Sequence, residues 1–278
     1  MVRRKTESGL SIGIRSTLTS FQKGFPLIEK QSPSEFKIKI ASTLEEREAV
    51  FHLAYKTYLV KGFINPNAQE WLVQNYDDKK ETIILCVLDY SKKLAGSLTL
   101  VFDESIKLPA EKIYGEEIKT LHSKGEKLLE VSRLVISPEY RNTKEILHLL
   151  FNYMFIYSYH IKKYSAMVIE VNPKHKIYYK SLLKFDEIGA EKACPSVQNA
   201  PAILLHIPLS RYQSEVIRCA NYLEQNIKER SLYPHFLKLE QEKLVVNYLE
   251  KQVKPMSSEE KIYFGFTESG INKAVCIA

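Results

Sequence analysis

The segment Thr143–Lys162 limits how this chain can fold more than any other feature. It follows a strand-like run, Leu128–Ser137, that ends at Pro138, and its apolar residues cover nearly every side of the helix that it predicts. A helix that is apolar all round is buried, so we expect it to pack on the face of a sheet. Its most apolar part, residues 146–161, contains polar side chains and is shorter than the roughly 20 residues that a bilayer requires. No membrane-spanning helix is predicted.

Alternating and helical patterns predict the other elements. Apolar residues at every second position indicate strands, and apolar residues three to four apart, bounded by capping residues, indicate helices. The predicted strands are Phe36–Ile40, Thr82–Leu88, Leu94–Val101, Leu128–Ser137, Ala166–Val171, a short one near Ile188, and Ala202–Ile207. The predicted helices are one that follows a cap at Ser42 or Thr43, then Ala110–Leu121, Thr143–Lys162 and His175–Leu183. This order favours an α/β or α+β fold with a mixed central sheet flanked by helices.

Three regions are expected along the chain. Residues 1–35 are polar and lack sustained periodicity, which predicts a flexible or partly helical arm. Residues 36–209 contain all the predicted strands and form the central domain. Apolar residues recur at helical spacing from residue 210 onward, so residues 210–278 predict a helical C-terminal extension.

The composition restricts the possible partners. Lys and Arg number 40 against 33 Asp and Glu, a net charge of +7, which favours acidic partners such as nucleic acid, anionic lipid or an acidic carrier protein. No zinc-finger or RNP-like pattern supports nucleic acid. The four cysteines are far apart, which predicts neither a metal site nor disulfides and suits the cytoplasm. No signal peptide is predicted.

The junction between the strand Leu128–Ser137 and the helix after it resembles that of GNAT acyltransferases. In that family an R-x-x-G-x-G/A loop at the helix start binds the pyrophosphate of coenzyme A through backbone N–H groups. The matching segment here is Arg141-Asn142-Thr143-Lys144-Glu145-Ile146, which keeps the arginine and lacks both glycines. This departure makes a full pyrophosphate harder to bind than the single phosphate of phosphopantetheine.

Four further stretches resemble the FeeM-type N-acyl amino acid synthases, a GNAT-fold family related to the LuxI-type acyl-homoserine lactone synthases. They are the aromatic segment Phe51–Tyr58 with Gly62-Phe63, the E-x-S-R strand Leu129–Leu134 that LuxI-type enzymes also carry, the N-P-x-H segment Val171–His175 with Tyr178, Tyr179 and Phe185, and the closing strand Asn199–Leu205. The resemblance covers about residues 36–209. One departure is Thr99, where related sheets often carry arginine.

The resemblance implies an enzyme that moves a long-chain fatty acyl group from acyl carrier protein to the amino group of an amino acid. It implies a bacterial, cytoplasmic acyltransferase with no bound cofactor and no metal. Its partners would be the carrier protein, the amino acid and, through the lipid product, a membrane surface. Three alternatives stay open: a GNAT N-acetyltransferase that uses acyl-coenzyme A, an acyl-homoserine-lactone-type synthase, and a non-catalytic binding module that uses the helical C-terminus.

Glu130 is the candidate general base, because burial of a carboxylate in an apolar strand raises its pKa and improves it as a proton acceptor. The alternative is a structural carboxylate that pairs with a basic residue elsewhere. Strand geometry places Ser132, a second catalytic candidate, on the same face as Glu130, and Arg133 on the opposite face. Arg133 suits a carboxylate, either of the protein or of an amino-acid substrate.

Two backbone positions and two basic residues complete the predicted acyl-donor site. The oxyanion donor is expected to be an N–H near Val135 or Ile136, where the resemblance implies that the fourth strand separates from its neighbour. We assign Ile136 to catalysis and Val135 to the phosphopantetheine arm. Arg141 and Lys144 flank the helix start that would bind phosphate, unless they form a solvated basic face.

Three more residues are predicted to bind substrate. Tyr55 and Tyr58 lie three apart on a helix, so they share a face and are candidates for an acyl or amino-acid pocket, with core packing as the alternative. Asn172, in the N-P-x-H segment, is the third.

Overall fold

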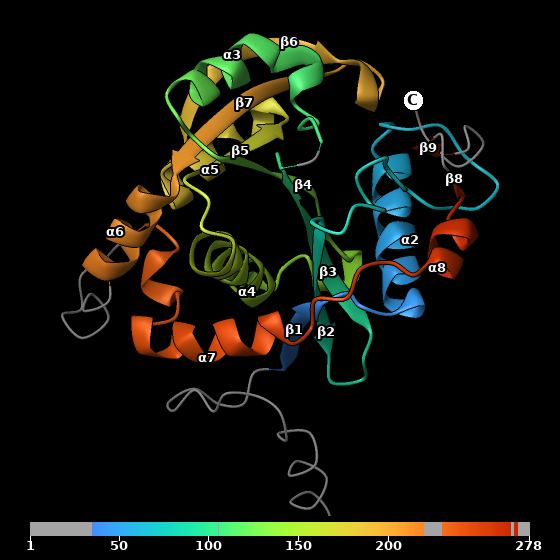
Figure 1. Ribbon diagram of the computed structural model, residues 1–278, viewed down its shortest axis with the longest axis horizontal. Coiled ribbons are helices and arrows are strands. Elements are labelled where there is room, and N and C mark those ends of the chain that lie inside the picture. Colours follow the sequence, from blue (N-terminus) through green and yellow to red (C-terminus); the bar gives the residue numbers. More distant parts are fainter. Residues whose placement is uncertain (1–34, 105, 220–229, 268–269, 272–278) are drawn as a thin grey trace, which may run out of the picture.

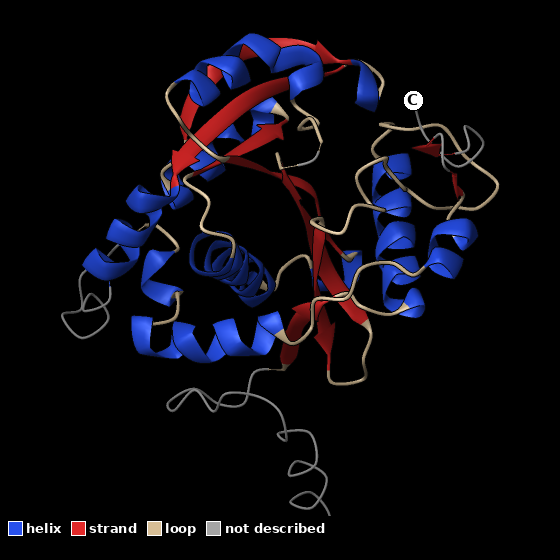
Figure 2. Ribbon diagram, viewed as in Figure 1, coloured by secondary structure: helices blue, strands red, loops and turns tan. Residues whose placement is uncertain are grey.

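The computed structural model describes residues 35–104, 106–219, 230–267 and 270–271. The arm predicted over residues 1–35 lies outside this description, except for Glu35. The predicted mixed sheet flanked by helices is confirmed (Figures 1 and 2). Every strand and helix predicted for the central region is present, with bounds that mostly differ by one or two residues. The division of the chain into three domains stays a prediction.

Seven strands form one sheet in the order β1-β2-β3-β4-β5-β7-β6. All neighbours are antiparallel except β4 and β5, which run parallel. The strands are β1 (Phe36–Ile40), β2 (Ile83–Asp89), β3 (Leu94–Phe102), β4 (Leu128–Ile136), β5 (Ala166–Val171), β6 (Asp186–Cys194) and β7 (Ala200–Pro208). The strand predicted near Ile188 is thus longer than expected. A separate ladder joins β8 (Phe266–Thr267) and β9 (Gly270–Ile271).

The helices alternate with the strands and then follow them. The helices are α2 (Leu44–Val60), α3 (Glu111–Ser123), α4 (Lys144–Phe155), α5 (Lys176–Leu183), α6 (Leu209–Cys219), α7 (Leu239–Glu250) and α8 (Ser258–Tyr263). Helix α2 begins at the predicted cap, because the Thr43 side chain accepts a hydrogen bond from the amide of Glu46. Helix α4 continues into a π-helical turn, Ile156–Ile161, and together they account for the predicted helix Thr143–Lys162.

Different helices cover the two faces of the sheet. On one face, α4 buries Ile146, Leu150 and Phe155 in the largest hydrophobic cluster together with side chains of β1 to β5, as its all-round apolar surface predicted. Helices α2 and α3 cover the opposite face (Figure 1). None of the described helices combines the length and apolar character needed to cross a membrane.

The C-terminal helices pack back onto the sheet and onto α2. Helices α6 and α7 add apolar side chains to the cluster around α4. Helix α8 packs on α2, where the ring of Phe264 lies 4.9 Å from that of Phe51 and 5.3 Å from that of Trp71. An ion pair between Arg47 and Glu260 joins the same two helices. The described helices of the extension are therefore part of the packed structure.

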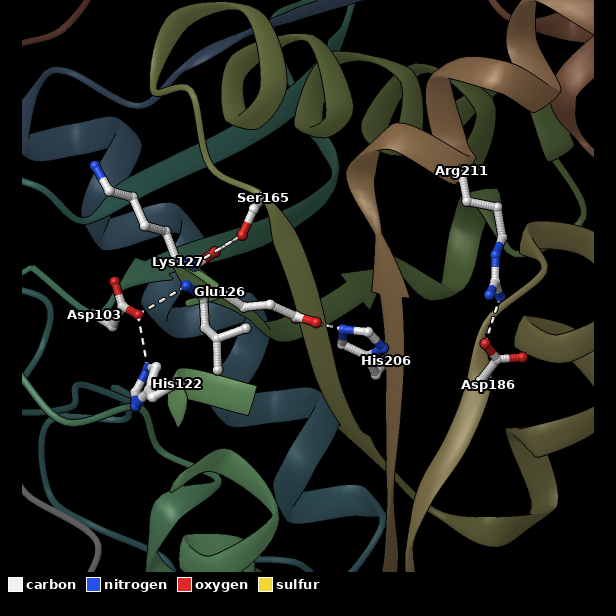
Figure 3. Close-up of polar contacts among 9 residues, drawn as sticks. Asp103, His122, Glu126, Lys127, Ser165, Asp186, His206 and Arg211 are labelled. Atoms are coloured by element: carbon white, nitrogen blue, oxygen red, sulfur yellow. Dashed lines mark hydrogen bonds and ion pairs between the residues drawn. The ribbon is translucent and has the colours of Figure 1, made fainter. Parts of the chain in front are cut away.

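Polar contacts hold the first residues of β4 and β5 together (Figure 3). The amide of Lys127 donates to Ser165 Oγ at 2.8 Å, and the Lys127 carbonyl accepts from the amide of Ala166 at 3.2 Å. Asp103 Oδ2 accepts from the amide of Leu128 at 2.7 Å and contacts His122 Nε2 at 3.0 Å. A further pair joins Glu126 and His206 on neighbouring segments, at 2.8 Å. These contacts fix one end of the β4–β5 pair.

Candidate active site

Strands β4 and β5 separate at their other end. Their pairing stops at Glu130, opposite Val168, although β4 continues to Ile136 and β5 to Val171. A cavity of about 2190 Å³ opens at the gap and is lined by residues of both strands. The separation that the resemblance implied for the fourth strand is therefore present.

The cavity has two chemically different parts on the two faces of the sheet. We call the part toward α4 and α5 the apolar chamber; its lining includes Leu147, Phe151, Met154, Met167, Ile169 and Phe185. We call the part toward α2 and α3 the polar chamber; its lining includes Tyr58, Tyr76, Glu130, Ser132 and Glu170. Glu130 belongs on this side because its antiparallel partner Val101 packs with Tyr114 and Ile118 of α3. A substrate in the gap would contact both chambers.

Glu130 is buried, with 3 % of its surface exposed, and has an unusual environment for a carboxylate. Its Oε2 accepts a hydrogen bond from the amide of Ala110 at 2.7 Å. Among the described residues no cation forms an ion pair with it, so the alternative of a carboxylate paired with a basic residue is not found. Burial raises the pKa of Glu130 to about 8, with smaller contributions from the charges of Glu170 and Glu111, while the Ala110 amide lowers it. A carboxyl group with that pKa exchanges protons near neutral pH.

Ser132 lies two residues further along the same face, as predicted. Its Oγ is 3.0 Å from the hydroxyl of Tyr76, which also lines the polar chamber. Burial raises the pKa of this tyrosine well above its ordinary value, so both hydroxyls are neutral and either one can be the donor.

The face predicted for Arg133 is wrong. The register between β3 and β4 shifts between Ser97 and Thr99, so β4 contains an extra residue, and Arg133 has a positive φ of 51°. The bulge turns the Arg133 side chain to the same face as Ser132, where it donates to Thr99 Oγ1 at 2.9 Å. A strict period of two cannot anticipate such a bulge.

The carboxylate that Arg133 binds belongs to the protein. Both terminal nitrogens of Arg133 donate to the buried carboxylate of Asp77, and Nη1 also donates to the Leu72 carbonyl at 2.8 Å. The guanidinium lies between the rings of Phe51 and Tyr76, 5.3 and 5.2 Å from their centres. Burial alone would lower the pKa of Arg133, but the adjacent Asp77 outweighs it and raises the pKa. This geometry favours a structural role over the predicted contact with substrate.

The backbone of Ile136 faces the gap. The amide of Ser137 donates to the Ala95 carbonyl at 2.9 Å, and antiparallel pairs alternate between hydrogen-bonded and non-bonded positions. Ile136, opposite Gly96, therefore takes a non-bonded position and directs its N–H away from β3, toward the gap. The N–H of Val135 is directed to β3. Of the two predicted oxyanion donors, the geometry favours Ile136.

Basic residues border the cavity where α2 ends and α4 begins. We call this group the basic rim; it consists of Lys61, Arg141, Lys174 and His175, all of them exposed cavity-lining residues. Burial and the charge of Arg141 lower the pKa of Lys61, and burial, Lys61 and Lys174 lower that of His175. The local potential is therefore positive. Among the described residues no acidic side chain pairs with the rim.

The family-model match extends over most of these elements. The model of the family described as N-acyl amino acid synthase FeeM matches residues 49–208, which is more than half of the chain and includes the cavity-lining strands β4, β5, β6 and β7. The chain belongs to this family. It is therefore an acyltransferase, and its reaction class is N-acyl transfer.

Two solved structures have a fold similar to that of this chain. The structure of FeeM, an N-acyl amino acid synthase from uncultured soil microbes, is 24 % identical, with a TM-score of 0.57, and the match covers 66 % of this chain and 96 % of that one. The acyl-homoserine lactone (AHL) synthase LasI is 15 % identical, with a TM-score of 0.50 and coverage of 63 % and 91 %. No curated protein matches the chain.

The other predicted residues of the synthase fall into two groups. Tyr58 and Asn172 line the cavity, and Asn172 Oδ1 also accepts from the amide of Lys174 at 3.1 Å. Burial raises the pKa of Tyr58 to about 12. Tyr55 packs in a core cluster and Lys144 is exposed at the start of α4, and neither lines the cavity. Their predicted binding roles gain no support from the geometry.

Three residues around the polar chamber were absent from the sequence prediction. Glu170 carried the same signal as Glu130, a carboxylate inside an apolar strand. Tyr76 and Asp77 lie in the polar segment before β2, where no periodic pattern marks a role. Only the folded chain brings them to β4.

Proposed function

We propose that this synthase transfers a long-chain fatty acyl group from the phosphopantetheine thioester of an acyl carrier protein to the amino group of an amino acid. The observation that carries the proposal is the cavity at the β4–β5 gap, which joins an apolar chamber to a chamber containing Glu130, a carboxyl group with no ion-pair partner among the described residues. An acyl chain needs the first environment, and an amine that must lose a proton needs the second.

Two features favour a carrier protein over coenzyme A as the donor. The start of α4 has Lys144 and Ile146 where a pyrophosphate-binding loop would have glycines, so a single phosphate is easier to place there. The basic rim and the net charge of +7 suit an acidic carrier protein. With that donor we place the reaction in the bacterial cytoplasm, where the lipid product can contact a membrane surface.

The proposed reaction forms one C–N bond and breaks one C–S bond. The neutral amine attacks the thioester carbonyl carbon, and the N–H of Ile136 donates a hydrogen bond to the oxyanion. Before the attack, Glu130 accepts one proton from the ammonium form of the amine. The tetrahedral intermediate then expels the phosphopantetheine thiolate, whose sulfur takes up the second proton of the nitrogen as the amide forms.

A paired assay tests the proposal. The purified synthase would receive a pool of the twenty amino acids with either a long-chain acyl carrier protein thioester or the matching acyl-coenzyme A, and mass spectrometry would detect N-acyl products. We expect product with the carrier-protein donor, and the mass of the product identifies the amino acid. Product from coenzyme A alone would refute the carrier-protein assignment.

A charge variant of the basic rim sharpens the donor assignment. We expect Arg141→Ala with Lys61→Ala to raise the KM for the acyl carrier protein about tenfold or more, in a salt-dependent way. The matched control is Lys119→Ala, an exposed lysine on α3 outside the cavity lining. No product with either donor, from a folded sample, would refute the proposed function itself.

A further inference from the structure

The polar chamber contains a second carboxylate, Glu170, that the mechanism above does not use. On β5 it lies two residues beyond Val168, the partner of Glu130, so both carboxylates are on the same face of the sheet. They stand on opposite sides of the gap at the point where the two strands stop pairing. Glu170 lines the cavity and is half-buried.

Glu170 has no cationic partner among the described residues. The thiol of Cys194 on β6 donates a hydrogen bond to the carboxylate. The charge of Lys112 acts on it from α3, but the Lys112 ammonium donates to Ser196 Oγ at 3.3 Å. By contrast, Glu117 of α3 and Glu187 of β6 form ion pairs with Lys192 and Lys176. A half-buried carboxylate without a cation faces the space that the acceptor would occupy.

We propose that Glu170 binds the ammonium group of the acceptor and holds it beside Glu130. The inference rests on the proposed function, since it assigns a second contact to the same acceptor. An amino acid carries its amine as ammonium at neutral pH, and a charge-assisted hydrogen bond to a carboxylate stabilises that form. Glu130 then accepts one proton from the ammonium nitrogen, and the neutral amine attacks the thioester carbonyl. Burial raises the pKa of Glu170, and the thiol of Cys194 and the charge of Lys112 oppose that rise. The bound ammonium favours the ionised carboxylate further.

This role gives Glu170 a selectivity that a packing role lacks. The carboxylate favours acceptors that enter as cations, such as amino acids, over amine nucleophiles that are neutral at the same pH. Hydroxylamine is such a nucleophile at pH 7.5, and it is small enough to enter any site that accepts an amino acid. The ratio of the reaction rates with the amino acid and with hydroxylamine therefore reports on the charge of Glu170.

The test compares steady-state kinetics of the wild type and Glu170→Gln. The acceptor amino acid identified above is varied at saturating acyl donor, then the donor is varied at saturating acceptor. We expect the KM for the amino acid to rise about 10- to 100-fold, the size of a lost hydrogen bond to a charged group. The KM of Glu170→Gln for the donor should stay within about twofold of the wild-type value. Its rate with hydroxylamine as the acceptor should change little.

Further variants keep the test independent of folding. Glu170→Asp retains the charge and should recover part of the loss, and Cys194→Ser retains a donor to the carboxylate whereas Cys194→Ala does not. Glu191→Gln, which removes an exposed carboxylate of β6, is the control and should match the wild type. If Glu170→Gln leaves the KM for the amino acid unchanged, or if it lowers the rates with both acceptors equally, Glu170 does not bind the ammonium.

The two proposals fail differently. If the wild type acylates an amino acid and Glu170→Gln has the same KM for that amino acid, only the inference about Glu170 is refuted. If the wild type acylates no amine from any donor, the proposed function is refuted and this inference with it.

Discussion

Two buried carboxylates near the same segment of β4 have opposite environments. Asp77 accepts hydrogen bonds from both terminal nitrogens of Arg133 and from the amide of Gln74, the last at 2.7 Å. Glu130, equally buried, accepts one amide hydrogen bond and has no cation beside it among the described residues. One carboxylate is paired with a cation, and the other has no such partner among the described residues.

This difference distinguishes a structural carboxylate, Asp77, from a candidate catalytic one, Glu130. Burial raises the pKa of Asp77, while the charge and hydrogen bonds of Arg133 oppose that rise. The pair joins two segments of the chain, β4 and the segment before β2. A buried carboxylate without a cation keeps its proton to a higher pH and is ready to exchange it. The residue identities and the burial are alike, so the partner decides which role each carboxylate has. The predictions below test that assignment.

The largest expected effect is on turnover when Glu130 is changed. Glu130→Gln removes the proton acceptor but keeps a side-chain oxygen that can accept from the Ala110 amide. We expect kcat/KM for acyl transfer to fall about 10² to 10⁴-fold with little change in the unfolding temperature. The measurement is the product rate by mass spectrometry beside a thermal unfolding curve. Activity within a few-fold of the wild type would remove Glu130 from the mechanism.

The second effect is on stability when Asp77 is changed. Asp77→Ala leaves the Arg133 guanidinium buried without its carboxylate, and breaking a buried pair in this way typically costs about 3–5 kcal/mol. Urea unfolding of the wild type and the variant gives the difference directly.

The double variant Asp77→Ala with Arg133→Met is the matched control. It removes the buried charge together with its partner, so most of the lost free energy of unfolding should return. A cost below about 1 kcal/mol for the single variant would contradict the structural role of the pair.

The third effect is the contribution of Glu130 to the pH dependence of stability. Its folded-state pKa of about 8 is raised above the ordinary 4.5. The stability linked to its bound proton is therefore complete below about pH 4.5 and is lost as the pH rises through 8. Relative to Glu130→Gln, the wild type should lose roughly 2–4 kcal/mol of unfolding free energy between pH 5 and pH 9.

Urea unfolding at pH 5, 7 and 9 measures that loss. Glu191→Gln, which removes an exposed carboxylate, should follow the wild type over the whole range. If the difference between the wild type and Glu130→Gln does not change with pH, Glu130 is not a buried group that keeps its proton near neutral pH.

The sequence was sufficient for the elements of the fold because their patterns depend on burial alone. The helix over Thr143–Lys162 had to be buried, and α4 with its π-helical turn is buried against the sheet. The length of β6 was underestimated because its register shifts twice, at Glu187/Gly189 and Gly189/Lys192, and those irregularities obscure the alternation.

The candidate site was only partly predictable. A carboxylate in an apolar strand is visible in the sequence, which marked Glu130, and the same reasoning applied to β5 would have marked Glu170. The face of Arg133 depends on a bulge that no spacing reveals, and its partner Asp77 comes from a segment without periodicity. Long-range pairing of this kind is a property of the folded chain. The sequence therefore identified the candidate base better than the ion pair that holds the strand beside it.

The smallest effect concerns the neutral hydroxyl pair beside Glu130. Because Ser132 Oγ is already engaged with the hydroxyl of Tyr76 at 3.0 Å, we expect Ser132→Ala to cost about 1 kcal/mol of unfolding free energy and to lower kcat/KM less than about tenfold. Tyr76→Phe removes the same hydrogen bond from the other side, so the double variant should cost little more than either single one. A loss of kcat/KM near that of Glu130→Gln would instead give Ser132 a direct role in catalysis. In that case the catalytic role would not belong to the Glu130 carboxyl group alone, because the uncharged side chain of Ser132 would share it. The comparison with the Asp77–Arg133 pair would then have to include both residues on this face of β4.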